Sequence, residues 1–514
     1  MDRERYIACI RALAEGLMTR ACMLVLGSWV AVAACSSSGS DPAQPGGSAP
    51  QGPSARGDAS LPGTTAAGED GGLPMPTADA AAGGDASPAA VPYQHFDINH
   101  VLSTGQSNAV AIQGTPVLST TQPYGNLMFD SGVMPASSCD GDGCTVYQTP
   151  TSLVPLVEGD RFFGPVETMS SGLANQASKM ARERVLIGKP AHDILVSLHG
   201  RSGNNYWCLR KGGCPWWPSK SYVKPFDEAL MQVADALSLA QAAGKSYVVR
   251  AATAVHGEND HYAYESGNSV FPLPATGGGG GPSVADYGHG LEEWQRDYEQ
   301  SVKAITGQTI PVPLFIQQYS HWNNVPTTKI AYQQLAAHVR SNGKVVVVGP
   351  TYALPYSSDC LHFTGAAERH LGEYFAKAYA RVVLEGRRWE PLRPLTITRA
   401  GNVVTAKFLV PEPPLVLDTQ KVSDPGNYGF ELVDGSASPP AITNVAITAP
   451  DTVQITLAAA PIGPSPRLRY AYTFHGCAGP GTTARGNLRD SDATPSQAGY
   501  DLANWAVHFD EPVQ

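Results

Sequence analysis

The sequence of 514 residues lacks several features that mark large functional classes. It has no basic stripe interleaved with aromatic residues, and its formal net charge is −10, which argues against nucleic-acid binding. It contains no Cys-x-x-Cys, and the spacing of His256, Glu258 and His261 does not match a helical His-Glu-x-x-His arrangement, so a zinc site is disfavoured. No Gly-Lys-Ser/Thr follows the glycine run 277–281, which excludes a phosphate loop there and indicates a flexible insertion.

Long hydrophobic runs are also missing. The N-terminal apolar segment, Cys22 to Ala34, follows several arginines and is too short for an ordinary transmembrane helix, so it indicates a secretory signal. The ending Val-Ala-Ala-Cys resembles the lipobox of bacterial lipoproteins. That resemblance implies a signal peptide over residues 1–34, acylation of the Cys35 thiol, and export to an outer membrane or cell surface through this lipid anchor. The alternative is an ordinary secreted or periplasmic protein.

The segment after the signal has too few apolar residues to fold. Residues 35–92 are almost wholly Gly, Ala, Pro, Ser and Asp, which predicts a disordered tether. Six of the nine cysteines lie beyond the signal region, and an even number in an exported chain suggests disulfides. The natural local loops are Cys139–Cys144 and Cys208–Cys214, which leaves Cys360 with Cys477, although six cysteines allow fifteen connectivities.

The remaining chain is organised around the stretch Val101-Leu-Ser-Thr-Gly-Gln-Ser107-Asn-Ala109. An apolar run from Asp97 to Leu102 precedes Ser-Thr-Gly, and residues able to start a helix follow Ser107. This pattern predicts a strand that passes through a tight turn into a helix N-terminus, whose dipole favours developing negative charge near the serine. Many serines only cap helices. Ser107 is therefore a candidate nucleophile only if catalytic partners follow other strands.

Strand and helix patterns alternate after Ser107. Strands are predicted at 193–198, 246–254, 313–318 and 344–348 in addition to the first, and helices at 170–185, 222–243, 290–306, 329–340 and 364–384. Five strands alternating with helices predict an α/β fold with one parallel, doubly wound sheet. Ligands bind such sheets at the carboxyl ends of the strands.

Polar residues follow these predicted strands. The second strand leads into His199-Gly-Arg-Ser202-Gly203, where small residues let backbone N–H groups point at a ligand. The third leads to Asn259, whose amide can donate a hydrogen bond to an oxyanion. Just before the last helix, Asp359 stands three residues before His362, so its carboxylate can bond Nδ1–H and leave Nε2 to accept a proton from a hydroxyl.

This set of blocks resembles the SGNH (GDSL-like) hydrolases, through Gly-Gln-Ser-Asn, Gly-Glu-Asn-Asp and Asp-x-x-His. Within them it is similar to the sialic-acid-specific O-acetylesterase and carbohydrate acetylesterase branch, over roughly His95 to Glu385. The resemblance implies a flavodoxin-like five-stranded sheet in an esterase domain over residues 93–389.

The resemblance also implies a role for each matching residue. Ser107 would be the nucleophile, His362 the general base and Asp359 its orienting partner. The oxyanion hole would comprise the Ser107 N–H, a backbone N–H from the second block and the Asn259 amide. That branch usually has Gly-Gly in the second block, and here Ser202 stands in place of the first glycine, so the donor is Ser202, Gly203 or Gly200.

Other residues are candidates for substrate contact. These are Gln106, Asn204, Asn205, Tyr206 and Glu258. Trp207, Trp216 and Trp217 lie in the loop between Cys208 and Cys214 or beside it, where they either stack on sugar faces or anchor the loop.

The pattern changes over residues 390–514. Short strands at 395–398, 403–409, 442–447, 452–457 and 468–472 predict an antiparallel β-sandwich, with a stabilising or carbohydrate-binding role. We therefore expect an exported serine esterase that removes short acyl groups, chiefly acetyl, from carbohydrates without a metal or cofactor. The alternatives are an acyltransferase, a lipase-like esterase, and a cell-surface glycan-binding protein with a vestigial site.

Overall fold

The computed structural model describes residues 92–137, 146–161, 164–213, 223–276, 283–321, 328–476 and 483–514. These residues lie within one compact unit, Asp70–Gln514. Several expectations concern residues outside these ranges and stay predictions: the signal segment, Cys35, the tether up to residue 91, the glycine run 277–281, Trp216, Trp217, and the cysteines 139, 144, 214 and 477. Within the described ranges, no helix has both the length and the apolar character needed to cross a membrane.

A seven-stranded sheet lies at the centre of the α/β part, in the order β11-β10-β9-β1-β8-β2-β5. Its strands are β1 (Ile98–Gly105), β2 (Leu127–Phe129), β5 (Leu153–Pro155), β8 (Ile194–Leu198), β9 (Tyr247–Val255), β10 (Leu314–Gln318) and β11 (Val345–Pro350). The neighbours from β11 to β2 pair in parallel, and only β5 is antiparallel to its neighbour. The class of fold was therefore predicted correctly, but the sheet has two strands more than the five predicted. Both extra strands are three residues long, too short for a hydrophobic period to reveal them.

The described residues form seven α-helices, and five of them lie close to predicted positions, whereas the two shorter ones, which begin at Tyr206 and Glu258, were not predicted. The helices are α3 (Met169–Met180), α4 (Tyr206–Leu209), α5 (Pro225–Ala242), α6 (Glu258–Glu265), α7 (Tyr287–Thr306), α8 (Ile330–Ser341) and α9 (Gly365–Tyr379). Two π-helical segments, Ala181–Val185 and Ala380–Leu384, continue α3 and α9. Local chemistry sets several ends: the side chains of Thr168, Asp286 and Thr364 accept hydrogen bonds at the starts of α3, α7 and α9.

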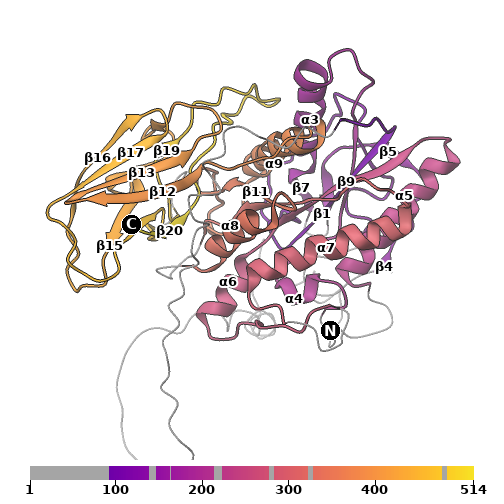
Figure 1. Ribbon diagram of the computed structural model, residues 1–514. Coiled ribbons are helices and arrows are strands. Elements are labelled where there is room, and N and C mark those ends of the chain that lie inside the picture. Colours follow the sequence, from indigo (N-terminus) through magenta and orange to yellow (C-terminus); the bar gives the residue numbers. More distant parts are fainter. Residues whose placement is uncertain are drawn as a thin grey trace, which may run out of the picture. The chain divides into compact units, whose positions relative to one another are not determined.

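Helices cover both faces of the sheet (Figure 1). Val101 belongs to a cluster with Leu173 of α3 and Phe375 of α9. The next residue, Leu102, points to the opposite face and belongs to a second cluster with Trp294 of α7, together with side chains of α5 and α8. Strands β1, β8 and β9 are buried at every position, as expected of parallel strands covered on both sides.

The predicted helix after Ser107 does not form. Residues 106–113 make a series of turns, in which Val110 N–H donates to Gln106 O at 3.1 Å and Gly114 N–H to Ala111 O at 2.9 Å. Ala111 has a φ of 56°, in the left-handed region, and this interrupts any continuing helix. The prediction that a helix dipole acts on Ser107 is therefore wrong, because the serine lies in a turn.

The C-terminal part contains separate antiparallel sheets. A four-stranded sheet has the order β12 (Arg393–Ala400), β13 (Val403–Leu409), β17 (Thr452–Leu457) and β16 (Ile442–Ala449). A three-stranded sheet has the order β15 (Phe430–Val433), β18 (Arg467–Tyr470) and β20 (Phe509–Pro512). The rings of Phe408 and Phe509, one from each sheet, have centroids 6.1 Å apart. A face-to-face sandwich stays a prediction, while the antiparallel strands themselves are present.

Short elements complete the described fold. They are the pairs β3 (Ala136–Ser137) with β4 (Val146–Tyr147), β6 (Gly159–Arg161) with β7 (Gly164–Val166) and β14 (Val416–Leu417) with β19 (Leu488–Arg489), and the 3₁₀ turn Asn427–Gly429.

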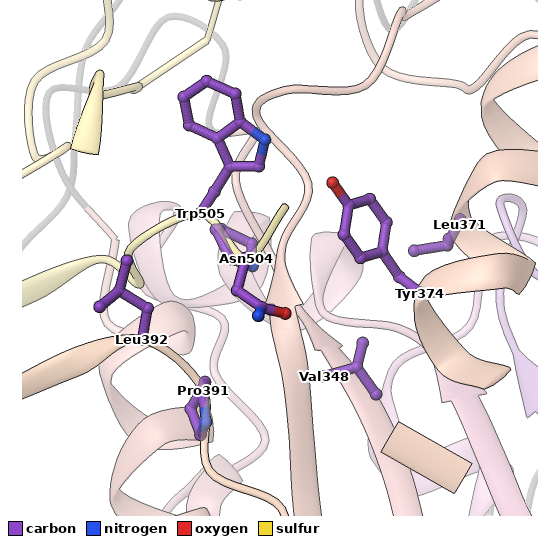
Figure 2. Close-up of a pocket in the computed structure, with 9 residues that line it drawn as sticks. Val348, Leu371, Tyr374, Pro391, Leu392, Asn504 and Trp505 are labelled. Atoms are coloured by element: carbon purple, nitrogen blue, oxygen red, sulfur yellow. The ribbon is translucent and has the colours of Figure 1, made fainter. Parts of the chain in front are cut away.

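The chain end packs into the α/β part. The Lys377 ammonium of α9 is buried and lies 2.6 Å from the Asp492 carboxylate, and Tyr352 OH donates to Ala506 O at 2.7 Å. Figure 2 shows the junction, where Tyr374 faces Asn504 and Trp505 around a cavity of about 10 Å³, room for about one water molecule. One hydrophobic cluster contains residues from both sides of position 390, where a domain boundary was predicted. The α/β part and the antiparallel part therefore share a core.

Candidate active site

Ser107 lies two residues after the end of β1, in a turn that begins at Gly105, a position that requires glycine. Gly105 has a φ of 132°, and a Cβ at this position would lie 2.1 Å from Val255 O. Gln106 N–H donates to the same carbonyl at 3.1 Å, which closes the chain against the end of β9. Ser107 is 5% exposed, so the turn leaves little of this residue in contact with solvent.

Gln106 connects this turn to the block that follows β9. Its side-chain Oε1 accepts a hydrogen bond from Asn259 N–H, with an N···O distance of 3.1 Å. The same turn contacts the block after β8, because Arg201 N–H donates to Gly105 O at 2.9 Å. Gln106 was predicted to contact substrate. Its side chain is only 2% exposed and bonds the start of α6, so Gln106 is better placed to hold α6 against the turn that contains Ser107 than to contact substrate.

Asn108 connects the turn to the block that contains His362. Its Nδ2 donates to Leu361 O at 3.2 Å, and its Oδ1 accepts from Phe363 N–H at 3.1 Å. The side chain therefore bonds the backbone on both sides of His362. The Nδ2 group also donates to Glu258 Oε1 at 2.8 Å. Asn108 had no predicted role beyond its place in Gly-Gln-Ser-Asn, because its partners lie far away along the chain.

Asp359 and His362 form a hydrogen-bonded pair. The Nδ1 of His362 lies 2.6 Å from Oδ2 of Asp359, whose other oxygen accepts from Ser357 OH at 2.6 Å and from Leu361 and His362 N–H, each at 3.0 Å. Partial burial alone would raise the pKa of Asp359, but these hydrogen bonds, first of all from His362, hold it well below its usual value. The carboxylate is therefore ionised at neutral pH and fixes the orientation of the ring.

The second ring nitrogen of His362, Nε2, bonds no other residue in the described part of the chain. The structure likewise shows no direct hydrogen bond between Ser107 and His362, both of which are described. It joins their segments through Asn108. Hydrogen bonds between catalytic groups are often long before substrate binds, so this geometry is compatible with proton transfer from Ser107 to Nε2.

Backbone donors gather beside the serine. The N–H groups of Ser107, Ser202 and Gly203 donate to none of the described residues, whereas Arg201 N–H is used by Gly105. A Cβ on Gly200 would lie 3.0 Å from Gly105 O, so Gly200 packs under the turn, and Ser202 or Gly203 is better placed to face a ligand. Gly203 is exposed, with a φ of 69° and open space around its Cα.

The Asn259 side chain lies at the same place. Its Nδ2 donates to the carbonyl of Gly203, which ties the second and third blocks together. An amide has two N–H bonds, so one remains for a ligand. The residues predicted for the oxyanion hole are thus brought together around Ser107 by hydrogen bonds between the loops that carry them.

Two carboxyl groups lie beneath the site. Glu258 is 3% exposed, and burial raises its pKa even though Asn108 donates to it. Burial raises the pKa of Asp260 to about 7, opposed by a 2.8 Å hydrogen bond from Tyr206 N–H. Tyr206 is fully buried, and its hydroxyl donates to Glu293 at 2.8 Å. Because Glu258 and Tyr206 are buried, these side chains are better placed to support the loops of the site than to contact substrate. Asn204, in contrast, is partly exposed.

His256, which lies two residues before Glu258, is engaged in the core. His256 lies against Tyr287 OH at 2.8 Å through Nδ1 and Asn204 O at 3.1 Å through Nε2, and burial lowers its pKa to about 4. Among the described residues, no cluster of three or more His, Cys, Asp or Glu side chains is placed to hold a metal ion.

Comparison with known proteins finds similarity among solved structures. No protein-family model and no curated protein sequence matches the chain. Among solved structures, it is similar to a carbohydrate acetylesterase from Xanthomonas citri, with 12% identity and a TM-score of 0.46 over 80% of each chain. It is also similar to NanS, with 15% identity and a TM-score of 0.30 over 56% of this chain and 98% of the other.

A carbohydrate acetylesterase from Sinorhizobium meliloti is also similar, with 11% identity and a TM-score of 0.26 over 55% of this chain and 98% of the other. These identities and scores are low, so the function of this chain is inferred from its own residues.

Proposed function

We propose that this chain is a serine esterase of the SGNH type that removes acetyl groups from carbohydrates. The observation that carries the proposal is the Asp359–His362 hydrogen bond of 2.6 Å, held beside the Ser107 turn by the two bonds of Asn108 to Leu361 and Phe363. A hydroxyl, an imidazole and a carboxylate in this relation are the groups that acyl transfer requires.

The reaction begins with attack of Ser107 Oγ on the ester carbonyl carbon while His362 Nε2 accepts the hydroxyl proton. The oxyanion that forms is stabilised by the Ser107 N–H, a backbone N–H of Ser202 or Gly203, and the Asn259 amide. His362 then protonates the leaving alcohol oxygen, the bond from that oxygen to the carbonyl carbon breaks, and an acetyl-serine remains. Water, deprotonated by His362, attacks this ester and releases acetate.

Asp359 supports this cycle electrostatically. Since hydrogen bonds hold its pKa below the usual range, it remains ionised while the neighbouring imidazole gains and loses a proton. Its negative charge stabilises the imidazolium, and its bond to Nδ1 keeps Nε2 directed at the reacting groups.

Acetate release by the purified chain tests the proposal. Wild type should hydrolyse p-nitrophenyl acetate and acetylated xylo-oligosaccharides, and Ser107→Ala should abolish both activities with an unchanged circular dichroism spectrum. Asn259→Ala should lower kcat by about 100-fold or more, because it removes one oxyanion donor. Ser465→Ala, at an exposed serine of the C-terminal part, should behave as wild type. Acetate release that persists in Ser107→Ala overturns the mechanism.

The same assays separate the alternatives. Faster turnover of long-chain p-nitrophenyl esters would indicate a lipase-like esterase, and transfer of acetyl to an added sugar would indicate an acyltransferase. Glycan binding without turnover that depends on Ser107 would indicate a binding protein.

Export forms a second part of the proposal. It is supported by the signal-like segment before Cys35 and by the even number of cysteines beyond it. Incorporation of labelled fatty acid into wild type but not into Cys35→Ser would support the lipid anchor. Peptide mapping without reduction tests the predicted Cys208–Cys214 and Cys360–Cys477 pairs.

A further inference from the structure

A cleft of about 720 Å³ lies beside the oxyanion residues. Gly203 and Asn259 line it, and both also belong to the segments that supply the oxyanion donors. A substrate whose ester carbonyl reaches these donors therefore extends along this wall, which the block after β8 forms together with α6 and the turn that follows α6.

Several neutral polar groups line the cleft beside its apolar surface. Asn204, Asn205, Ser266 and Asn268 contribute amides and a hydroxyl, and Tyr262 contributes an aromatic ring. Asn205 accepts a hydrogen bond from Cys208 N–H through Oδ1, and its Nδ2 stays available as a donor. Amides and hydroxyls that both donate and accept match the hydroxyl groups of a sugar, and an aromatic ring provides a surface for its apolar face.

The charge of the cleft has one sign. Glu265 is the only charged side chain among the described residues that line it, and it is exposed. The two arginines of the neighbouring block are turned away: Arg201 pairs with Glu228 with both side chains fully buried, and Arg210 Nη1 lies 2.8 Å from a carboxylate oxygen of Glu293. Neither guanidinium is free to bind a substrate carboxylate.

We propose that this cleft binds the sugar part of an uncharged O-acetylated glycan, and that Glu265 determines specificity by repelling sugars that carry a carboxylate, such as sialic and uronic acids. The proposal rests on the esterase function proposed above. A carboxylate at this wall would meet a like charge without a compensating cation among the described residues that line the cleft. A single like-charge contact near water corresponds to about a fivefold loss in affinity.

The test compares two substrates that differ by one charge. These are a methyl glucoside with one O-acetyl group and the matching O-acetylated methyl glucuronoside, with acetate release measured on the full chain at low and high salt. Wild type should have a kcat/KM at least about fivefold higher for the glucoside at low salt, and the ratio should narrow at high salt because salt screens the repulsion. Glu265→Lys should reduce or invert the ratio, and Glu265→Gln should bring it close to one.

Glu183→Lys provides the control for net charge. Glu183 is exposed just beyond α3, near the point where the chain enters β8, so it lies by the amino ends of the strands, and its substitution should leave the ratio unchanged. Equal or better turnover of the glucuronoside by wild type, or a ratio that Glu265→Lys does not move, overturns the specificity proposal alone. If wild type hydrolyses neither glycoside nor p-nitrophenyl acetate, the proposed esterase function itself fails.

Discussion

Asn108 gives the sharpest test of how the site is assembled. It is 1% exposed and takes part in three hydrogen bonds, with Glu258, Leu361 and Phe363, at 2.8, 3.2 and 3.1 Å. Asn108→Ala removes all three and leaves a buried carboxyl, a carbonyl and an N–H group without this partner. The two backbone bonds flank His362, so their loss should release the general base from its place beside Ser107.

The magnitude follows from the number of bonds. A buried hydrogen bond contributes about 1 kcal/mol net, so three of them predict a loss of about 3 kcal/mol in the free energy of unfolding. The kinetic effect should be larger than this loss of stability suggests, because a displacement of about 1 Å in a catalytic group can lower turnover by about 100-fold. We therefore expect kcat for p-nitrophenyl acetate to fall by about 100-fold or more at a temperature where the variant is folded.

Asn487→Ala is the matched control. This asparagine is fully buried in the C-terminal part and donates to Asp418 O at 3.0 Å and Val422 O at 2.6 Å. Its removal should cost about 2 kcal/mol of stability by the same reasoning and leave kcat unchanged. The two variants are compared by urea denaturation and by initial rates. If Asn108→Ala loses stability as Asn487→Ala does but keeps kcat within about threefold of wild type, Asn108 does not position His362.

Two further predictions concern carboxyl groups. Asp359→Asn should lower kcat by about 10³- to 10⁴-fold. Because hydrogen bonds depress the folded pKa of Asp359 despite partial burial, its stabilising effect is present above the unfolded pKa of 3.8 and lost below it, so urea midpoints of wild type and variant should converge as pH falls below about 4. Burial raises the pKa of Asp260 to about 7, so wild-type stability should fall as pH rises from about 4 to 7, and Asp260→Asn should remove that fall; a variant with the same slope contradicts this.

Local patterns in the sequence predicted most of the α/β part. The strand expected at 246–254 is β9 at Tyr247–Val255, and the helix expected at 290–306 is α7, which begins three residues earlier, at Tyr287. The early start was hidden because Gly288 weakens the helical pattern ahead of position 290. Gly290 is needed for packing, since a Cβ there would lie 3.0 Å from the Tyr206 ring. Periodicity does not report such a contact, which joins residues far apart in the chain.

The candidate site was predicted in its parts but not in its connections. The structure brings the segments of Ser107, Asn259, Asp359 and His362 together, as strand ends of a parallel sheet allow. The sequence could not show that Asn108 bonds residues more than 250 positions away, nor that polar side chains in the loops are buried. Burial depends on what covers a segment, and Tyr206, the first residue of α4, is covered by α7 and by the ring of Phe271.

Gln106 and Asn108, the residues on either side of Ser107, explain how the serine can be held in place while its hydroxyl stays free of hydrogen bonds with the described residues. Gln106 holds α6 through Asn259 N–H, and Asn108 holds the backbone around His362, so each amide fixes one wall of the site. The Ser107 hydroxyl makes no hydrogen bond with the described residues and is free to turn toward a substrate carbonyl. His362 is held at Nδ1 alone, which leaves Nε2 able to serve first the serine and then the leaving oxygen. The rigidity needed for catalysis therefore resides in the amides that flank the serine, and the mobility resides in the groups that react.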